Sequence, residues 1–568
     1  MDARLVGAER LMRDMRAIAQ WERLSGSPEE RKAFEYIERE LRAERIRTQL
    51  LEHPALISLP QRATFRLVGP GGTSGEELPC ITHSFSASTA PMEAPVIYLP
   101  DDAGAPKVSL LAQVVVTDGP AMPNRVAELQ RARAAAAVFL NRDPMVHEMI
   151  VSTVWGSPTP DRVAELPTIP VVSMAGSPAR RLREVLETGG PVRAVISTQV
   201  ETSWRMLPLL VADLPGVRED TFVLLAGHVD SWYLGAMDNA GANAAMMEIA
   251  RLMASARRYR GLKVAFWSGH SHGRYAGSTW YADTCWDELD RNCAVHLYID
   301  SVGGRGATVL TSSYCMPETK AVGAAAIRKV AGQKYEGARV GRAGDQSFLG
   351  IGIPSLFMTL SEHPPRGPES SRDFAITGGE TGGLGWWWHT PEDTPDKIDP
   401  ANLARDTAIY FEAIRTLCGE PFLPLDYVAT TSEIVTQLQA LQTRLGDRFD
   451  LSGCLAEARA LERAVRGLRA RARKIGTGRW RHVEAINRTL MRLGRVLIPA
   501  LYTQSGRFDH DPATSIPPLP PLAGAEALAG IPSDSPKAHA LMIALTRGRN
   551  RLIDALRRAR EIAEEAAG

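Results

Sequence analysis

The spacing of apolar residues predicts helices at the start of the chain. Phe34, Ile37 and Leu41 recur at near-helical intervals, so roughly the first 50 residues are expected to be helical. Ser27 followed by Pro28 is typical of a helix start, because a serine side chain caps free N–H groups and proline suits the first turn. We therefore expect a helical opening, with one helix beginning at Pro28.

Between residues 60 and 200 the pattern changes to short β-branched runs separated by turns. Apolar runs stand at 96–99, 114–117, 137–140 and 169–173, and helical stretches at 125–136 and 178–187. This alternation predicts a separate mixed α/β module. The chain is expected to leave this module and return to the rest of the fold near residues 192–198.

From about residue 205 to 418 the chain alternates strand, loop and helix. Residues 222–226 and 262–267 are near-continuous apolar runs, as strands buried on both faces require. The Ala-, Met- and Leu-rich stretch 240–256 predicts a helix between them, and further strands are expected at 296–299 and 355–358. We expect an α/β sheet with helices on both faces.

After about residue 430 the chain becomes helical. Apolar and Arg/Glu positions alternate in helical period over 432–444, 455–472 and 479–501, and a final helix is expected at 536–566. The basic stripes of these helices are interspersed with acidic residues, which favours solvated or partner-facing helix faces over a nucleic-acid surface.

Composition narrows the class of protein. A chain of 568 residues is too long for one core, and 44% hydrophobic with 23% charged residues is typical of a soluble globular protein. The 66 basic residues nearly balance the 65 acidic ones, so neither a nucleic-acid nor a membrane partner is expected. Six scattered cysteines without a CxxC pair, and a start without an apolar signal segment, predict a cytoplasmic protein with reduced thiols.

Four ionisable residues follow the predicted strands or stand in the loops just beyond them. They are His228, Asp238, Asp300 and His389. Ligands bind at the carboxyl ends of the strands in open α/β sheets, and two imidazoles with two carboxylates suit zinc or another divalent first-row metal. Asp230 is placed to accept the second ring N–H of a ligating histidine.

The same segments resemble a known family. Gly227-His-Val-Asp-Ser, Met237-Asp-Asn-Ala-Gly, Tyr298-Ile-Asp-Ser and Trp388-His-Thr-Pro-Glu-Asp-Thr are similar, in this order, to the motifs of the zinc aminopeptidases grouped with glutamate carboxypeptidase II and the transferrin receptor. The resemblance implies a mixed, doubly wound sheet of zinc-exopeptidase type, built from residues 1–60 and 205–420. It also implies a protease-associated insert at 60–204 and a helical, dimerisation-like domain at 421–568.

The resemblance further implies roles for the four residues. His228 and Asp300 would bind one metal ion, His389 a second, and Asp238 would bridge the two, with Asp230 as a supporting carboxylate. Zinc is the first candidate, with manganese, nickel, cobalt and iron as alternatives. A homodimer is expected, because the helical tail is domain-sized and serves dimerisation in the family.

One segment departs from the family pattern. The family places Glu-Glu after the apolar strand, the first as general base and the second as metal ligand. Here His270, Ser271 and His272 follow that strand. Counting from the strand puts His270 at the base position, and counting back from Gly277 and Ser278 puts His272 at the ligand position. Two neutral imidazoles in place of two carboxylates leave the site more positive, so we predict weak binding of a second metal, or a mononuclear site.

Three alternatives remain open for this segment. A receptor-like member could have lost the reaction and kept only a binding role. Gly269-His-Ser-His-Gly273 also fits the Gly-x-Ser-x-Gly spacing of a nucleophile elbow, with Ser271 as nucleophile, although the metal residues would then have no purpose. A non-peptidase amidase acting on a small N-acyl compound is the third.

The predicted reaction is attack of metal-activated water on the carbonyl of a peptide or small amide, with His270 as proton acceptor. Candidate substrate contacts are Glu380 or Glu369 for an α-amine, Arg274 or Arg342 for a carboxylate, and Trp388 for an apolar group. His147, in the insert, is expected to belong to a lid over the site.

Overall fold

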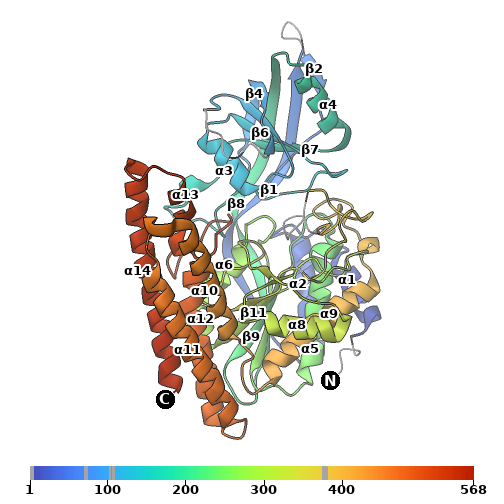
Figure 1. Cartoon of the computed structure of the whole chain (residues 1–568). Helices are drawn as coiled ribbons and strands as arrows, with labels where there is room; N and C mark the ends of the chain where they lie inside the picture. The colour runs from blue at the N-terminus through green and yellow to red at the C-terminus, as the bar shows by residue number, and fades with distance from the viewer. Residues whose placement is uncertain are drawn as a thin grey trace.

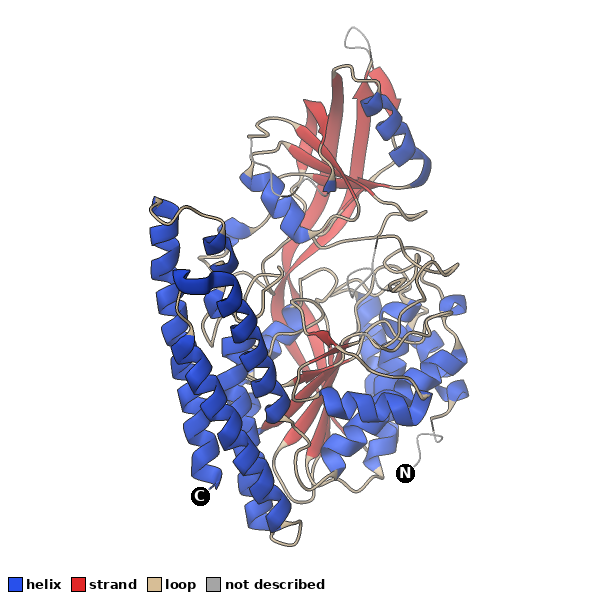
Figure 2. Cartoon of the chain, in the orientation of Figure 1, coloured by secondary structure: helices blue, strands red, loops and turns tan. Residues whose placement is uncertain are grey.

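The computed structural model describes residues 6–69, 74–101, 104, 109–311, 313–373 and 381–567 (Figure 1). Three parts can be followed along the colour ramp. An insert stands at the top, a sheet with covering helices lies below it, and a bundle of long helices runs down one side (Figure 2).

The chain opens with α1 (Ala8–Ile18) and α2 (Pro28–Ala43). The predicted cap is confirmed, because Ser27 Oγ accepts the N–H of Glu30 at 3.1 Å. The prediction of helix to about residue 50 was wrong at its end, since β1 begins at Arg47. The side chain of Ile46 is buried, but it packs in the core at the turn before the strand rather than on a helix face.

Two long strands join the insert to the body. β1 (Arg47–Val68) and β8 (Val192–Leu214) pair antiparallel from Arg47 opposite Asp213 to Leu67 opposite Ala194. Residues 192–198, where the chain was expected to leave the insert, are therefore the first part of the continuous strand β8. Because this ribbon runs through both parts, a single 14-stranded sheet spans the insert and the body (Figure 2).

The insert is the predicted α/β module. Its sheet consists mainly of β4 (Thr89–Tyr98), β5 (Val114–Asp118), β6 (Ala136–Leu140) and β7 (Val171–Met174), and its helices are α3 (Pro123–Arg131) and α4 (Gly176–Glu187). β4 to β7 are parallel to their neighbours in turn. Separate apolar clusters cover the two faces of this sheet.

The body contains the parallel strands β9 (Phe222–His228), β10 (Gly261–Trp267), β11 (Cys293–Tyr298) and β14 (Ser355–Leu356). Val223 and Leu225 of β9 belong to the core under α5 (Ala242–Ala254) and α9 (Pro400–Gly419). Leu224 and Ala226 face the opposite cluster, which includes residues of α6 (Ala276–Thr284) and α7 (Trp286–Asn292). Both faces are covered, as the near-continuous apolar runs predicted.

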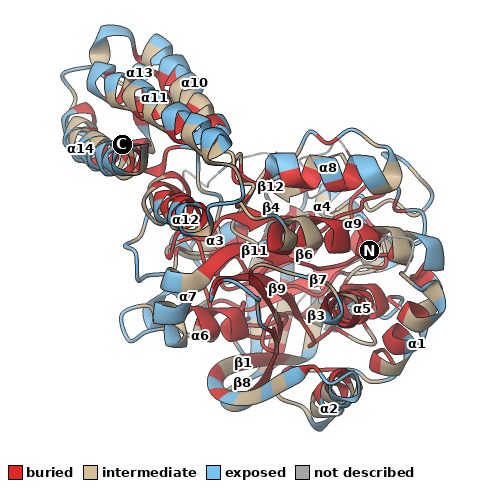
Figure 3. Cartoon of the chain, turned by 90° about the horizontal axis from the view of Figure 1, so that it is seen from below, coloured by how far each residue is buried: buried red, intermediate tan, exposed pale blue. Residues whose placement is uncertain are grey.

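The tail is helical, as predicted. It comprises α10 (Tyr427–Leu445), α11 (Ser452–Ile475), α12 (Trp480–Tyr502), the short α13 (Ala525–Ala529) and α14 (Pro536–Ala567). Arg495 of α12 ties the tail to the body by donating to the carbonyls of Cys293 (2.6 Å) and Gly352 (3.0 Å). Viewed from below, buried residues concentrate around the sheet and exposed ones along the outer helices (Figure 3).

Within the described part of the chain, no helix has the length and apolar character needed to cross a membrane. All six cysteines are free thiols, and four of them are buried.

Candidate metal centre

The parallel strands bring the predicted ligands to one edge of the sheet. His228 is the last residue of β9, and Asp300 stands two residues after the end of β11. The loop that carries His270 follows β10, which lies beside β9 in the sheet. This is the edge at which open α/β sheets bind ligands.

Asp238 reaches the same edge from a tightly held loop between β9 and α5. Asp393 fixes this loop by accepting the N–H groups of Met237 (2.8 Å) and Asp238 (3.0 Å). Gly235 opens the turn at φ +48°, where an added Cβ would lie 2.2 Å from the carbonyl oxygen of Asp238. Burial raises the pKa of Asp393 to about 7. The loop thus holds a carboxylate at a fixed point despite its irregular backbone.

The buried side chain of Arg23 stabilises the loop that carries Asp238. Arg23 donates to the carbonyl oxygens of Val229 (2.8 Å), Leu234 (2.8 Å) and Gly235 (3.0 Å). Burial lowers the pKa of Arg23 to about 10, which leaves it cationic at neutral pH. This residue was not predicted from the sequence, because a lone arginine near a helix end carries no signal of burial.

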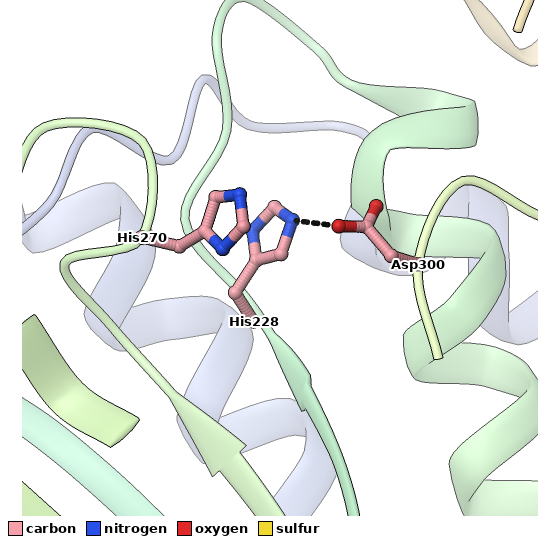
Figure 4. Close-up of side chains that lie close together, drawn as sticks. All are labelled: His228, His270 and Asp300. Carbon is pink, nitrogen blue, oxygen red and sulfur yellow. Dashed lines mark ion pairs between the residues drawn. The ribbon is translucent and has the colours of Figure 1, made fainter. Parts of the chain in front are cut away.

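Asp238 lies between two imidazoles. Its Oδ1 is 3.0 Å from Nε2 of His228, and its Oδ2 is 2.8 Å from Nε2 of His389. Oδ2 of Asp300 is 3.5 Å from the same Nε2 of His228 (Figure 4). The structure therefore brings together the four framework residues His228, Asp238, Asp300 and His389, with Asp238 between the two imidazoles.

The other nitrogen of each imidazole is fixed by a main-chain carbonyl. Nδ1 of His228 donates to the carbonyl oxygen of Asp230 (2.8 Å), and Nδ1 of His389 donates to that of Glu148 (2.6 Å). Such bonds orient a ligating imidazole and leave the lone pair of Nε2 free. In His228 the nearby carboxylates outweigh burial, which alone would lower the pKa of this ring, and raise it well above its usual value.

Several converging atoms lack a hydrogen bond. Among the described residues these include Nε2 of His228, His272 and His389 and Oδ1 of Asp238, all of them buried. Buried polar atoms are normally satisfied, so a cluster of lone-pair donors without partners fits a divalent cation bound between them.

Asp230 organises the site differently from the prediction. Its main-chain carbonyl, not its carboxylate, accepts the ring N–H of His228, and Oδ1 lies 3.6 Å from that nitrogen. The carboxylate accepts instead from the N–H of Ser271 (2.7 Å), the N–H of His270 (3.3 Å) and Oγ of Ser25 (2.7 Å). Asp230 thus fixes the loop that carries the two unusual histidines.

His270 lies beside His228 and Asp300. Its ring stacks on that of His228 at 3.8 Å, and its ligand atom lies within 4.8 Å of those of His228 and Asp300 (Figure 4). Nδ1 of His270 donates to Oδ2 of Asp345 (2.6 Å), and Oγ of Ser278 donates to the other oxygen of that carboxylate. Nε2 is thereby left with a lone pair. Asp345 was not predicted from the sequence, because it stands in a loop without a flanking periodic pattern.

His272 occupies a different position. Its Nδ1 lies 2.9 Å from Oγ of Ser25, and its ring packs at 4.1 Å on that of Trp232. Burial lowers the pKa of His272, which favours the neutral ring. The group of His228, His270 and Asp300 does not include it.

Ser271 lacks the partner that a nucleophile needs. Its Oγ is buried and makes no hydrogen bond within the described part of the chain. The neighbouring imidazoles contact Asp345 and Ser25 instead. This geometry gives no support to a serine–histidine pair at the elbow-like spacing.

Two of the predicted substrate contacts are occupied by the protein itself. Arg274 donates to the carbonyls of Ile150 and Ser152, so it binds the insert to the body instead of facing the ligands. Arg342 donates to the carbonyls of Gln346 (3.3 Å) and Asp511 (2.6 Å). The expectation that either arginine is free to hold a substrate carboxylate is corrected accordingly.

The other predicted substrate contacts, Glu369, Glu380 and Trp388, differ in their surroundings. Glu369 accepts from Nε1 of Trp386 (3.0 Å) and from Arg305 (3.3 Å), and Glu380 lies outside the described residues. Trp388 stacks on His389 with ring centroids 3.4 Å apart. Of this set, Trp388 alone is described in direct contact with a framework residue.

The insert contributes directly to the site. His147 donates from Nδ1 to the carbonyl of Trp388 (2.5 Å), and the N–H of Glu148 donates to the carbonyl of His389 (2.9 Å). The lid role expected of His147 stays a prediction. Glu148 was missed, because an insert residue 241 positions from its histidine partner leaves no local trace in the sequence.

Comparison with known proteins gives the family. Residues 210–414, which include all four framework residues, match peptidase family M28. This segment is similar to the members of that family. The match confirms the predicted relation to the metallo-exopeptidases, and the matched segment coincides with the body of the fold and its metal edge.

A curated relative from maize, named a probable glutamate carboxypeptidase VP8, is 24% identical over 78% of this chain and 71% of its own. The aminopeptidase from Aneurinibacillus sp. strain AM-1 has a similar structure, with TM-score 0.55, 21% identity, and 73% of this chain and 95% of that chain covered. An M28 peptidase precursor from Shewanella amazonensis gives TM-score 0.57, 16% identity, and 74% and 96% coverage. These structures confirm the mixed α/β fold around the matched segment.

Proposed function

We propose that this protein is a metal-dependent exopeptidase-type hydrolase that cleaves an amide or peptide bond with water. The observation that carries the proposal is the convergence of buried Nε2 atoms of His228 and His389 on the two oxygens of Asp238. The M28 match supports the same chemistry.

The residues fit a divalent metal, with zinc as the first candidate. His228, Asp238 and Asp300 would hold the first ion, and His389 with the other oxygen of Asp238 would hold a second. When bound, the metal polarises the scissile carbonyl and makes water a stronger acid. The chain's own contribution is to orient the imidazoles, through the carbonyls of Asp230 and Glu148, and to keep solvent out.

His270 is proposed as a further nitrogen ligand of the first ion, because it groups with His228 and Asp300. Its role as proton acceptor, which the sequence suggested, is the alternative. Since imidazole brings no negative charge, we propose one tightly bound ion and a second bound more weakly. His272 is the candidate additional ligand for that second position, since its buried Nε2 has no hydrogen bond.

A carboxypeptidase-type reaction is the second candidate, because a cavity of about 580 Å³ between the insert and the segment 368–386 is rich in arginine. Arg142, Arg180, Arg183 and Arg372 line it, together with Trp386. Arg142 and Arg183 form ion pairs with Asp101 and Asp118. The guanidinium groups suit a carboxylate or another anionic group. The name of the maize relative agrees with this candidate.

A substrate panel tests the proposal. Aminoacyl anilides, N-acyl amino acids and peptides ending in glutamate are offered to protein supplied with Zn, Mn, Co, Ni or Fe. Metal-dependent hydrolysis of one class is expected. Turnover confined to small N-acyl compounds would favour an amidase, and lack of turnover with every metal would favour a receptor-like binding protein. We also propose that the helical tail forms a homodimer, which light scattering tests.

A further inference from the structure

A second group of side chains of the metal-binding type lies where the insert meets the body, apart from the metal edge. It consists of Asp143 and His147, from the loop after β6, and Asp373, from the body. One nitrogen or oxygen of each lies within 4.8 Å of those of the other two. Asp143 is 2% exposed and His147 is fully buried. Two carboxylates gathered out of water in this way are costly unless a positive group lies between them.

His147 is held in the same way as the two framework histidines. Its Nδ1 donates to the carbonyl of Trp388 (2.5 Å), and its Nε2 lies 2.9 Å from Oδ2 of Asp143. His228 and His389 likewise donate from Nδ1 to a main-chain carbonyl, and their Nε2 atoms lie 3.0 and 2.8 Å from carboxylate oxygens. A neutral ring that donates from Nδ1 has a lone pair on Nε2. A proton or a metal ion must therefore lie between Nε2 of His147 and the carboxylate.

Two buried oxygens beside this pair favour the metal ion over the proton. Oδ2 of Asp373 accepts the N–H groups of Arg142 (2.9 Å) and Asp143 (3.0 Å), whereas Oδ1 is buried and has no hydrogen bond among the described residues. Asn141, which is 5% exposed, places its Nδ2 3.4 Å from Oδ2 of Asp373, and its own Oδ1 is also buried without a hydrogen bond there. A proton on His147 satisfies neither oxygen, but a cation attracts both.

The charges of the group also match a divalent cation. In the part of the chain that the structure describes, neither Asp143 nor Asp373 forms an ion pair with a lysine or an arginine. The neighbouring Arg142 pairs with Asp101 instead. With a neutral imidazole the group carries two negative charges, which one divalent ion balances.

The carboxylate of Asp143 is already oriented by its neighbours. Its Oδ1 accepts the N–H of Arg372 (2.8 Å), and its Oδ2 accepts the hydroxyl of Ser371. Bonds of this kind hold a metal-ligating carboxylate in place and leave it further lone pairs. Asn141 and Asp143 also line the arginine-rich cavity of about 580 Å³, which gives an ion a path to the group.

We propose that Asp143, His147 and Asp373 bind a divalent first-row metal ion at the junction of the insert and the body, with Oδ1 of Asn141 as a further donor. One imidazole with two carboxylates suits zinc or manganese. The group has one imidazole where the metal edge offers two, those of His228 and His270. We therefore expect this site to fill after the first ion at the metal edge.

An ion at this position has a structural role. Asp143 and His147 belong to the insert and Asp373 to the body, so the ion joins the two parts. His147 also contacts the carbonyl of Trp388, whose ring stacks on that of His389 at 3.4 Å. Binding of the ion should thus hold the insert against the segment that carries a framework histidine.

Anomalous diffraction from zinc-loaded crystals of the wild type tests the site directly. We expect an anomalous peak between Nε2 of His147 and the carboxylates of Asp143 and Asp373. Absence of a peak there at saturating zinc would overturn the inference and leave a protonated His147 paired with Asp143. A peak at His228 is a separate result, so failure of the proposed function is distinguished from failure of this site.

A zinc titration of variants gives a second readout that does not depend on turnover. Asp238→Asn is expected to empty the metal edge, and in this background a chelating dye should report one bound zinc per chain. Adding Asp373→Asn should weaken that binding at least about 10-fold. Asp161→Asn, an exposed change in the same insert, is the matched control and should leave it unchanged.

The same samples test the structural role. Zinc should slow amide hydrogen exchange in residues 141–149 of the Asp238→Asn protein, and this protection should be lost when Asp373→Asn is added. Equal zinc affinity with and without Asp373→Asn, in proteins that circular dichroism shows to be folded, would overturn the inference. If the double variant does not fold, the diffraction experiment on the wild type still decides.

Discussion

The carboxylate of Asp345 accepts the Nδ1–H of His270 at 2.6 Å, although the two residues are 75 positions apart. This pairing leaves Nε2 of His270 with a lone pair, and the ring of His270 stacks on that of His228. A carboxylate behind an imidazole is the usual support of a metal-ligating histidine. His270 is therefore held in place both by its hydrogen bond to Asp345 and by stacking on the ring of His228.

Replacing Asp345 with Asn should weaken this support. An amide removes the negative charge behind His270, so we expect metal affinity to fall about 10- to 100-fold. A competition titration with a chelating dye measures the affinity. Asp220→Asn, an exposed aspartate near the start of β9, is the control. Equal affinity in Asp345→Asn and wild type would contradict a ligand role for His270.

Replacing Asp238 with Asn should have a larger effect, because both oxygens of this carboxylate face imidazoles. One amide cannot supply two lone-pair oxygens and the charge. We expect loss of bound metal and a fall in turnover of more than about 100-fold. Metal analysis and kinetics on the purified variant check this, with circular dichroism to confirm folding. Full metal content in a folded Asp238→Asn protein would argue against the bridging position.

Replacing Ser271 with Ala should leave turnover within about threefold of wild type, since its hydroxyl makes no hydrogen bond. His228→Ala should abolish turnover in the same assay. If Ser271 proved essential and His228 dispensable, the result would instead support the hypothesis that Ser271 is the nucleophile.

Glu318 gives a prediction for stability against pH, far from the metal edge. Its side chain is buried and accepts from Oγ1 of Thr430 (2.8 Å) in α10, and burial raises its pKa from 4.5 to about 7. Between these values the unfolded chain is ionised while the folded one keeps its proton. The free energy of unfolding should therefore fall as pH rises through this window, by up to about 3 kcal/mol.

Glu318→Gln tests this effect because it keeps a neutral side chain at every pH. Urea unfolding at pH 4.5, 6 and 8 should show that the advantage of the variant over wild type grows with pH. The exposed change Glu187→Gln should show no such trend. A difference between Glu318→Gln and wild type that stays constant with pH would contradict a raised pKa.

Sequence patterns predicted the fold where periodicity is strong. The apolar run of β9 implied burial on both faces, and Val223 and Leu224 indeed pack in opposite clusters. Patterning could not show that β1 continues from the body into the insert, because a strand that passes between two environments has no single alternation.

The framework of the site was predictable because each ligand follows a strand or an adjacent loop with a specific motif. His228, Asp238, Asp300 and His389 all come together. Asp345 and Glu148 could not be found in this way. They reach the site from irregular loops, and contacts between distant loops leave no local pattern in the sequence.

Turnover measured against bound metal tests the metal centre most directly. The protein is stripped with chelator, and zinc is added back in steps while bound zinc per chain and hydrolysis of the best panel substrate are followed together. We expect no turnover in stripped protein and a rise that saturates near the first bound ion, because His228, Asp238 and Asp300 meet at one point. Turnover that persists after complete removal of metal would contradict a metal-dependent hydrolase.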